Sequence, residues 1–376
     1  MKNDDDKSDD IPKRDLYEGA DADANTFEFT KDGKTITVLG SDFQNPRVYI
    51  DEFVSEIIET KELAFEVTHG EKPAPTIRAL PLGRYLGRLK GFMRADQQGV
   101  LHSEKVRAFF QATEQLGLKD EPWSGKPSTY NPFVKKYEAE LLNELIQLIR
   151  TICQSKEFKS RSNARVYNAT RNLKGCKVFL DKLFKKHSRL LVIRLDFGYR
   201  LEYCKEITIA EAQMHLKRLF NNVRHNKLFD SFLKPIWRRE HGKEKGIHFH
   251  VVLFFDGHLS EKDEYIAAQI GEYWNTVVTK GKGVYFNCNR NKFNRYKRLG
   301  IGRIDYFDTE KRANLLEVVS YLTKKEIVTG MTEEGRFRAF GKGNMPSDKE
   351  NGPGRPRMYG PLNEETDVDE PDLCPD

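Results

Sequence analysis

The pair His248 and His250 is the sharpest chemical signal in the sequence, because both residues lie in the strand-forming run Ile247–Phe255. Side chains two residues apart in a β-strand point to the same face of the sheet. Both imidazoles should therefore face one side of the sheet, with Phe249 on the other, and this arrangement suits chelation of a metal ion. The alternative interpretation is a pair of core or surface histidines.

A carboxylate on the preceding predicted strand could complete such a metal site. Glu240 ends that strand, and a short turn joins it to the histidine strand. Two histidines and one carboxylate, with positions left open for water and phosphate oxygens, suit Mg²⁺ or Mn²⁺. His241 and Glu244 remain alternative third ligands, because the sequence does not fix the length of the turn. Glu240 could instead form an ion pair with Arg238 or Arg239 on an exposed strand.

The second candidate for chemistry is Tyr321, which lies in a predicted helix with Lys324 and Lys325 one turn later. Spacings of three and four place these lysines beside the tyrosine on one helix face. A free phenol has a pKa of about 10 and is a weak nucleophile at neutral pH. Adjacent ammonium groups favour its phenolate, and a metal ion on a target phosphate makes the phosphorus more electrophilic. The alternative is a tyrosine that packs its ring beside two solvated lysines.

A third feature is the segment Tyr285–Arg303, in which basic and aromatic residues alternate. Basic groups contact phosphates, and aromatic faces stack on unpaired bases. We therefore expect this segment to bind nucleic acid, with a solvated surface loop as the alternative. The residues concerned are Arg290, Lys292, Phe293, Arg295, Tyr296, Lys297, Arg298 and Arg303, together with Phe286.

These residues need a sheet and a helix to position them, and the hydrophobic pattern from residue 188 onward provides both. The pattern predicts the element order β-α-β-β-α-β with an extra strand and helix, which is the ferredoxin-like, or split βαβ, arrangement. The predicted strands are 190–195, 234–240, 247–255, 284–286 and 302–307. Helices are predicted to begin after caps at Thr208, Ser260 and Asp308 or Thr309.

The rest of the chain divides into a helical region and two tails. Apolar residues at helical spacing, such as Leu141, Leu145 and Ile149, predict a mostly helical accessory domain over residues 41–187. Residues 1–40 and 343–376 are rich in acidic side chains, and we expect both segments to be disordered. The region 188–342 is then the domain that carries the chemistry, within an overall α+β fold class.

The net charge of +6 for the 376 residues is an average over unlike segments. Residues 1–32 and residues 346–376 each carry a net charge of −6, which leaves +18 for residues 33–345. A body this basic favours a polyanion, nucleic acid first, as the partner.

The sequence also argues against several classes of protein. The first ten residues, MKNDDDKSDD, lack the apolar stretch of a secretory signal, and no run of residues is long and apolar enough for a membrane span. The five cysteines are far apart and form no C-x-x-C pair, so we expect reduced thiols rather than disulfides or a zinc site.

Taken together, the His248-Phe249-His250 strand and the Tyr321-x-x-Lys324 helix resemble the motifs of HUH endonucleases, the single-strand nickases that start rolling-circle replication. Leu190–Asp196 is similar to the apolar strand that forms the family's first motif. Glu240, ten residues before His250, is similar to the family's third metal ligand. The resemblance implies a ferredoxin-like sheet with the histidine strand in the middle and the tyrosine helix beside it.

Residues 190–342 resemble more narrowly the replication initiator of filamentous phages (inoviruses) and its prophage relatives, through the segments GIHFHVVLFF, GIGRIDYFD and VVSYLTKKE. Some members of the superfamily have two tyrosines on the helix. Glu317 and Lys325 stand one turn on either side of Tyr321, so the single-tyrosine form is implied. Because Lys325 follows Lys324, the sequence leaves open which lysine has the motif role.

The resemblance implies transesterification on single-stranded DNA. Tyr321 would attack phosphorus to give a 5′-phosphotyrosine and a free 3′-hydroxyl, and Lys324 would offset negative charge. His248, His250 and Glu240 would hold Mg²⁺ or Mn²⁺. The implied partners are single-stranded or supercoiled origin DNA and host helicase and polymerase, in the cytoplasm of a bacterial host cell and without a membrane.

Other functions remain open at this stage. A plasmid initiator, a relaxase or a transposase would use the same chemistry. A non-catalytic nucleic-acid-binding protein on a ferredoxin-like fold would explain the basic body but not the histidine and tyrosine motifs. A phosphoesterase with paired H-x-[ST] motifs is disfavoured, because the sequence has one H-x-H and no second copy.

Overall fold

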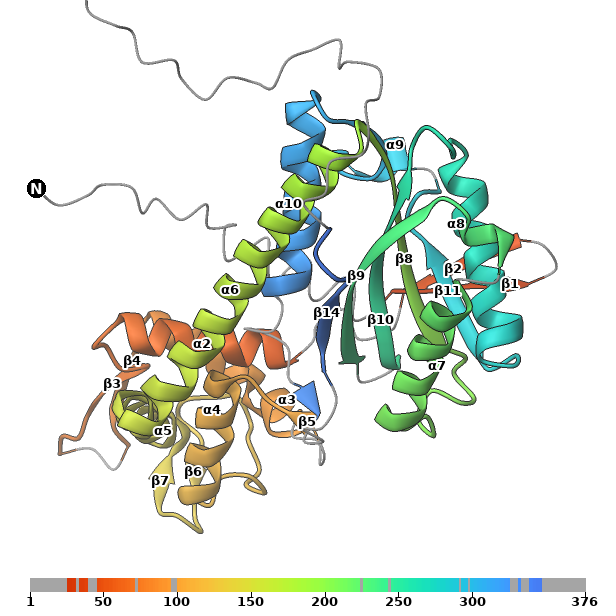
Figure 1. Ribbon diagram of the computed structural model, residues 1–376. Coiled ribbons are helices and arrows are strands. Elements are labelled where there is room, and N and C mark those ends of the chain that lie inside the picture. The colour runs from red at the N-terminus through yellow and green to blue at the C-terminus, as the bar shows by residue number, and fades with distance from the viewer. Residues whose placement is uncertain are drawn as a thin grey trace, which may run out of the picture.

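The protein has an α+β fold in which a helical N-terminal region precedes a six-stranded antiparallel sheet (Figure 1). The computed structural model describes residues 26–31, 34–39, 46–71, 74–95, 100–223, 226–242, 245–290, 292–296, 298–324, 331–332 and 338–346. The α+β class and the helical N-terminal region are as the sequence predicts.

The sheet contains all five strands that the sequence predicts, and one more. The strand order is β11-β8-β10-β9-β14, and β12 pairs with β8 beside β11. Every neighbouring pair is antiparallel. The strands are β8 (Arg189–Tyr199), β9 (Phe232–Gly242), β10 (Gly246–Asp256), β11 (Gly283–Asn287), β12 (Gly302–Asp305) and β14 (Phe340–Lys342).

Alternate residues of the strands face two different hydrophobic cores, because side chains in a strand point to opposite faces of the sheet. Leu191 and Ile193 of β8 pack with α7 (Ile209–Asn222) and α8 (Asp263–Tyr273). Leu190 and Val192 pack on the other face, with α6 (Lys156–Lys186) and α10 (Thr309–Lys324). The sheet therefore lies between two helical layers, with α7 and α8 on one side and α6 and α10 on the other (Figure 1).

Short helical elements complete this part of the chain. The 3₁₀ helix η3 (Lys227–Phe229) precedes β9, and a π-helical turn, η4 (Trp274–Val278), extends α8. The four-residue helix α9 (Lys292–Arg295) lies in the basic segment between β11 and β12. The strand pair β5 (Val100–Leu101) and β13 (Met331–Thr332) joins the two parts of the chain.

Two of the predicted helix caps are present and one is not. The side chain of Thr208 accepts a hydrogen bond from the Glu211 amide, and that of Asp308 accepts one from the Lys311 amide. The prediction for Ser260 was wrong, because α8 begins at Asp263 and the Ser260 hydroxyl instead bonds the Ser231 hydroxyl at 2.5 Å.

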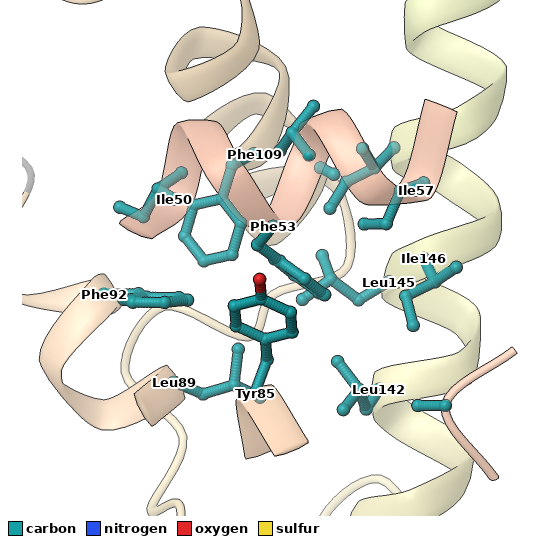
Figure 2. Packing of buried hydrophobic residues seen from close by; sticks show 14 of the residues in the cluster. Ile50, Phe53, Ile57, Tyr85, Leu89, Phe92, Phe109, Leu142, Leu145 and Ile146 are labelled. Carbon is teal, nitrogen blue, oxygen red and sulfur yellow. The ribbon is translucent and has the colours of Figure 1, made fainter. Parts of the chain in front are cut away.

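The helical region has a core of its own, shown in Figure 2. The ring of Phe53 lies between those of Tyr85, Phe92 and Phe109, with centroid separations of 4.6, 6.3 and 6.4 Å. Leu145 and its neighbours on α5 close the core. The elements that contribute are α2 (Pro46–Glu59), η1 (Pro81–Arg88), α3 (Leu89–Met93), α4 (Glu104–Gln115) and α5 (Glu138–Gln154).

Two hairpins flank this core, and a third lies in the segment expected to be disordered. The pairs β3 (Phe65–Thr68) with β4 (Thr76–Ala79) and β6 (Tyr130–Asn131) with β7 (Lys136–Tyr137) belong to the helical region. Strands β1 (Thr26–Lys31) and β2 (Lys34–Leu39) pair within the first 40 residues, which differs from our expectation. The alternating FEF and TITV patterns around the turn dipeptide Asp32-Gly33 are the hairpin signal that explains this difference.

Helix α6 connects the two cores. Its 31 residues span about 46 Å at 1.5 Å per residue. Phe158 in its first turn belongs to the core of the helical region, whereas Cys176, Phe179 and Leu183 belong to the core beneath the sheet. The boundary predicted at residue 188 therefore follows a helix whose second half already packs on the sheet.

Two further expectations concern the whole chain. None of the described helices is long and apolar enough to cross a membrane. Cys153, Cys176, Cys204 and Cys288 are buried free thiols, and Cys374 lies outside the described residues.

The core in Figure 2 gives a test with a matched control. Ile57 is fully buried in it, whereas the adjacent Ile58 is 45% exposed. Ile57→Ala should lower the free energy of unfolding by about 2–5 kcal/mol, because it leaves a cavity. Ile58→Ala should cost less than about 1 kcal/mol. Urea unfolding followed by circular dichroism measures both, and equal losses would contradict this packing.

Candidate metal centre

Two neighbouring strands, β9 and β10, bring the predicted ligands together, and a third strand, β8, lies beside them. His248 and His250 face the same side of the central strand β10, and Glu240 on β9 stands directly opposite His248 in the antiparallel register. On the other side of β10, Asp196 of β8 stands opposite His250. These positions share their face with Val252, which packs in the core beneath α6 and α10. The predicted ligands therefore lie on the face of the sheet that α10 covers.

The three side chains form a compact, buried cluster. Their potential ligand atoms all lie within 4.8 Å of one another. Glu240 Oε2 is 3.6 Å from His248 Nε2 and 3.4 Å from His250 Nε2. The exposed fractions are 8% for Glu240, 5% for His248 and 1% for His250.

The hydrogen bonds of the two imidazoles fix which ring nitrogen faces the cluster. His250 Nδ1 is 2.8 Å from Asp196 Oδ1, and His248 Nδ1 is 3.1 Å from the carbonyl oxygen of Gly246. An ionised carboxylate and a carbonyl can only accept, so both Nδ1 atoms must donate. When the rings are neutral, each Nε2 then presents a lone pair toward Glu240, as in metal-binding histidines.

Gly246 is suited to holding His248, because its backbone has a φ of 60°. Glycine adopts this left-handed conformation at little cost. A Cβ atom at residue 246 would also overlap the backbone carbonyl of Cys204. Gly246, the first residue of β10, can therefore direct its carbonyl oxygen toward the His248 ring.

The electrostatics of the cluster favour a cation. Burial lowers the pKa of His250, but the carboxylates of Asp196 and Glu240 outweigh it and raise the pKa to about 9. For His248, burial and the nearby His250 outweigh Glu240, so its pKa is lowered. Burial alone would raise the pKa of Asp196. The positive charges of His250 and Arg194 outweigh burial and lower this pKa below its ordinary value, so the carboxyl is ionised. A proton on His250 supplies the positive charge in the metal-free protein, and a metal ion can supply it instead.

The residues fit a divalent metal ion. Among the described residues, the buried Nε2 atoms of His248 and His250 have no hydrogen-bond partner. Two nitrogens and one carboxylate oxygen form a donor set that suits a first-row ion such as Mn²⁺ and can also hold Mg²⁺ with water. Asp196 and Gly246 supply the outer hydrogen bonds that orient such ligands.

The two rival third ligands are placed differently. His241 is the neighbour of Glu240 on β9, so its side chain points to the opposite face of the sheet. Burial and the nearby His248 lower its pKa to about 4. Glu244 lies outside the described residues.

Tyr321 lies on α10, above the same face of the sheet. Its ring packs against the core that contains Val252 and Leu322. The guanidinium carbon of Arg194 is 5.8 Å from the centre of the Tyr321 ring, and Arg194 Nε is 3.9 Å from Asp196 Oδ1. Arg194 thus stands between the tyrosine and the carboxylate that orients His250.

A second arginine connects α10 with the cluster. Arg238 Nη1 donates to the Leu322 carbonyl at 3.0 Å, and Arg238 Nε is 3.3 Å from Glu240 Oε1. Lys324 is the last residue of α10, but its side chain lies outside the described residues, as does Lys325. The structure therefore leaves open which lysine stands nearest to Tyr321.

The segment predicted to bind nucleic acid contains both buried and exposed side chains. Lys292 is buried and its ammonium is 2.8 Å from Asp263 Oδ2, and Tyr296 is half-buried against the core. Burial and the nearby Cys288 raise the pKa of Tyr296. Phe293 is 74% exposed, and Arg290 is also exposed.

The remaining basic residues of the segment lie toward the surface where they are described. Arg298 forms an exposed ion pair with Glu317 of α10 at 2.6 Å, and Arg303 Nε is 3.6 Å from Asp305 Oδ2. The side chain of Arg295 and all of Lys297 lie outside the described residues.

The sequence places Asp196 at the end of an apolar strand but predicted no role for it, and it predicted no role for Arg194. A signal was present. Along β8 the face that carries Leu190 and Val192 continues with Arg194 and Asp196, so it changes from apolar to charged. Charged residues on an otherwise buried face need partners, and here the partners are His250 and Tyr321.

Asp196→Asn tests the outer hydrogen bond. The amide lacks the negative charge that favours a donating Nδ1 on His250, so the dissociation constant for Mn²⁺ should rise about 10- to 100-fold. Isothermal titration calorimetry measures this constant. Asp305→Asn, on the same sheet at the Arg189 ion pair, is the matched control and should leave Mn²⁺ binding unchanged. An unchanged constant in Asp196→Asn would remove Asp196 from the centre.

Comparison with known proteins places these residues in a family. No curated protein and no solved structure matches the chain. A family model described as the YagK/YfjJ C-terminal domain matches residues 151–343. This segment is just over half of the chain, and it contains α6, the whole sheet, the metal-ligand cluster and the tyrosine helix. The chain therefore belongs to the YagK/YfjJ C-terminal domain family.

Proposed function

We propose that this protein cuts and rejoins single-stranded DNA by transesterification, with Tyr321 as the nucleophile and a divalent metal ion at Glu240, His248 and His250. One observation carries the proposal. The buried three-ligand cluster and the helix that bears Tyr321 lie on the same face of the sheet, with Arg194 between them. Nicking at an origin of rolling-circle replication, as in the HUH endonucleases, is the activity that combines these parts.

We further propose that the sheet domain is ferredoxin-like. Strands β8 and β9 run parallel to each other, and the antiparallel strand β10 lies between them. Strands β10 and β11 also run parallel to each other, with the antiparallel strand β8 between them. Helices α7 and α8 form the two crossovers and pack on one face. This strand order supports a split βαβ arrangement, and it leaves the opposite face for the metal ligands and α10.

The proposed reaction needs little covalent chemistry from the protein beyond the nucleophile. The Tyr321 phenol gives up its proton to solvent, and its oxygen bonds phosphorus as the bond from phosphorus to the 3′ oxygen breaks. The leaving 3′ oxygen takes up a proton from solvent and becomes the free 3′-hydroxyl. The new phosphotyrosine keeps a diester bond, so a later 3′-hydroxyl can reverse the step without ATP. When bound, the metal ion would polarise a phosphate oxygen. The guanidinium of Arg194 lies 5.8 Å from the centre of the Tyr321 ring and would stabilise negative charge that develops during the reaction.

The charge of the chain supports a nucleic-acid substrate. Residues 33–345 carry a net charge of +18, and such a body attracts phosphates. The exposed ring of Phe293 and the exposed Arg290 lie in the segment between β11 and β12. An exposed aromatic ring beside basic side chains is the combination that binds unpaired bases.

The decisive test is a covalent adduct. Purified protein with Mn²⁺ or Mg²⁺ and the single-stranded origin DNA of its own replicon should form a protein–DNA band on a denaturing gel. Tyr321→Phe keeps the ring and its contact with Arg194, so it should bind DNA but form no adduct. Tyr296→Phe is the matched control, since this tyrosine also lies near Arg194, and it should still form the adduct. Chelation of the metal should abolish the band.

The outcomes separate the competing functions. An adduct that persists in Tyr321→Phe would refute Tyr321 as the nucleophile. Wild-type protein that binds DNA but forms no adduct on any origin strand would favour a non-catalytic nucleic-acid-binding protein. A relaxase or transposase would give the same adduct, and mapping the cut strand on transfer-origin and transposon-end DNA distinguishes them.

Phe293→Ala tests the DNA-binding segment separately from the chemistry. Loss of one stacked base should weaken binding of a single-stranded oligonucleotide by about 1–3 kcal/mol, measured by fluorescence anisotropy. Phe133→Ala is the control, because Phe133 is 81% exposed but lies in the helical region. Equal affinity of both variants and the wild type would exclude stacking on Phe293.

A further inference from the structure

The three strands that build the metal centre carry a repeated pattern on one face. The central strand has the histidine pair, and each flanking strand has an arginine followed two residues later by a carboxylate. These are Arg194 and Asp196 on β8, and Arg238 and Glu240 on β9. In each flanking strand the carboxylate contacts a histidine, and the arginine contacts both the carboxylate and α10.

Arg238 makes the more direct connection. Its side chain is only 1% exposed, and it lies between Glu240 and the last turn of α10. The two carboxylate oxygens of Glu240 have different neighbours. Oε1 is 3.3 Å from Arg238 Nε, and Oε2 faces the two histidines. The same guanidinium donates through Nη1 to the carbonyl of Leu322, the residue after Tyr321. One buried side chain therefore orients a metal ligand and holds the backbone next to the proposed nucleophile.

Arg194 makes a parallel connection through side chains. Its guanidinium lies against the ring of Tyr321, and its Nε is 3.9 Å from Asp196 Oδ1. Asp196 in turn holds His250. The two arginines thus reach α10 at consecutive residues, one at the Tyr321 ring and one at the Leu322 carbonyl.

We propose that Arg238 and Arg194 are positioning residues that couple occupancy of the metal centre to the position of Tyr321. This inference rests on the proposed function for the role of Tyr321, but the coupling itself can be measured without DNA. A metal ion held by Glu240 and the two histidines would restrain the Glu240 carboxylate. Glu240 Oε1 contacts Arg238, and Arg238 donates to the Leu322 carbonyl. Restraint of Glu240 would therefore also restrain the last turn of α10.

The chemistry of the residues favours this role over simple packing. A buried ion pair contributes little stability compared with apolar residues of similar volume, because both charges must leave water. A buried arginine is therefore better explained by the geometry it imposes. Its planar guanidinium donates through Nη1 to the Leu322 carbonyl and keeps Nε at ion-pair distance from Glu240 Oε1, and a lysine ammonium does not reproduce this rigid, forked geometry. Its position near a helix C-terminus also suits the partial negative charge there.

Hydrogen–deuterium exchange read by mass spectrometry tests the coupling in the full-length protein. Mn²⁺ should slow amide exchange in residues 317–323 of wild-type α10 by about fivefold or more, the size typical of coupled sites. In Arg238→Met this effect of Mn²⁺ on α10 should be lost, while Mn²⁺ still binds. Arg238→Lys is a second variant that keeps the buried charge, in case Arg238→Met fails to fold, and it too should lose the effect.

Arg298→Met is the matched control. Arg298 also contacts α10, through Glu317, and among the contacts of the described residues none joins it to the ligand cluster. This variant should keep the full Mn²⁺-dependent slowing. The proposal is overturned if Mn²⁺ has no effect on α10 in the wild type, or if both Arg238 variants retain the whole effect.

The adduct assay separates this proposal from the proposed function. Arg238→Lys should bind Mn²⁺ within a few-fold of the wild type but form the adduct about tenfold more slowly or worse, because Tyr321 is displaced. Equal adduct rates in Arg238→Lys and the wild type would refute positioning by Arg238. Absence of any adduct in the wild type would refute the proposed function alone, and the exchange measurement would still decide the coupling.

Discussion

The site depends on two carboxylates, the buried Glu240 and the partly buried Asp196, placed on either side of the histidine strand. Buried negative charges are costly unless they are paired. Here each carboxylate has a histidine from β10 on one side and an arginine from its own strand on the other. The arrangement keeps both carboxylates charged inside the fold. It also makes the position between Glu240 Oε2 and the two histidine Nε2 atoms favourable for a cation.

The antiparallel register makes this arrangement possible. A shift of β9 by one residue would turn Glu240 to the other face of the sheet and bring His241 to the cluster. The apolar residues of the same strands hold the register, since Ile236 and Val252 are fully buried in the core beneath α6 and α10. The candidate metal site therefore lies at one end of a sheet face, and the other end of the same face is hydrophobic core.

The sequence predicted most of the sheet domain, because runs of strand-forming residues mark its strands and the caps at Thr208 and Asp308 mark the starts of two of its helices. His248, His250 and Glu240 followed from period-two spacing and a short turn. Arg238 was considered only as an alternative partner for Glu240, and its contact with the Leu322 carbonyl could not be predicted, because it joins segments 84 residues apart. The burial of Lys292 was missed for the same reason, since its partner Asp263 lies on a different helix. Local spacing shows which side chains share a face but not which distant element covers them.

Helix α6 lies wholly within the family match, which begins at residue 151, near the end of α5. Its second half supplies Cys176, Phe179, Leu180, Leu183 and Phe184 to the core beneath the sheet, so the sheet domain needs it to bury the face that carries the site. The helical region before it has a separate core. None of the described residues of that region belongs to the ligand cluster. The candidate metal ligands, the groups that contact them and the helix that bears Tyr321 all lie within residues 151–343, the segment that the family model matches.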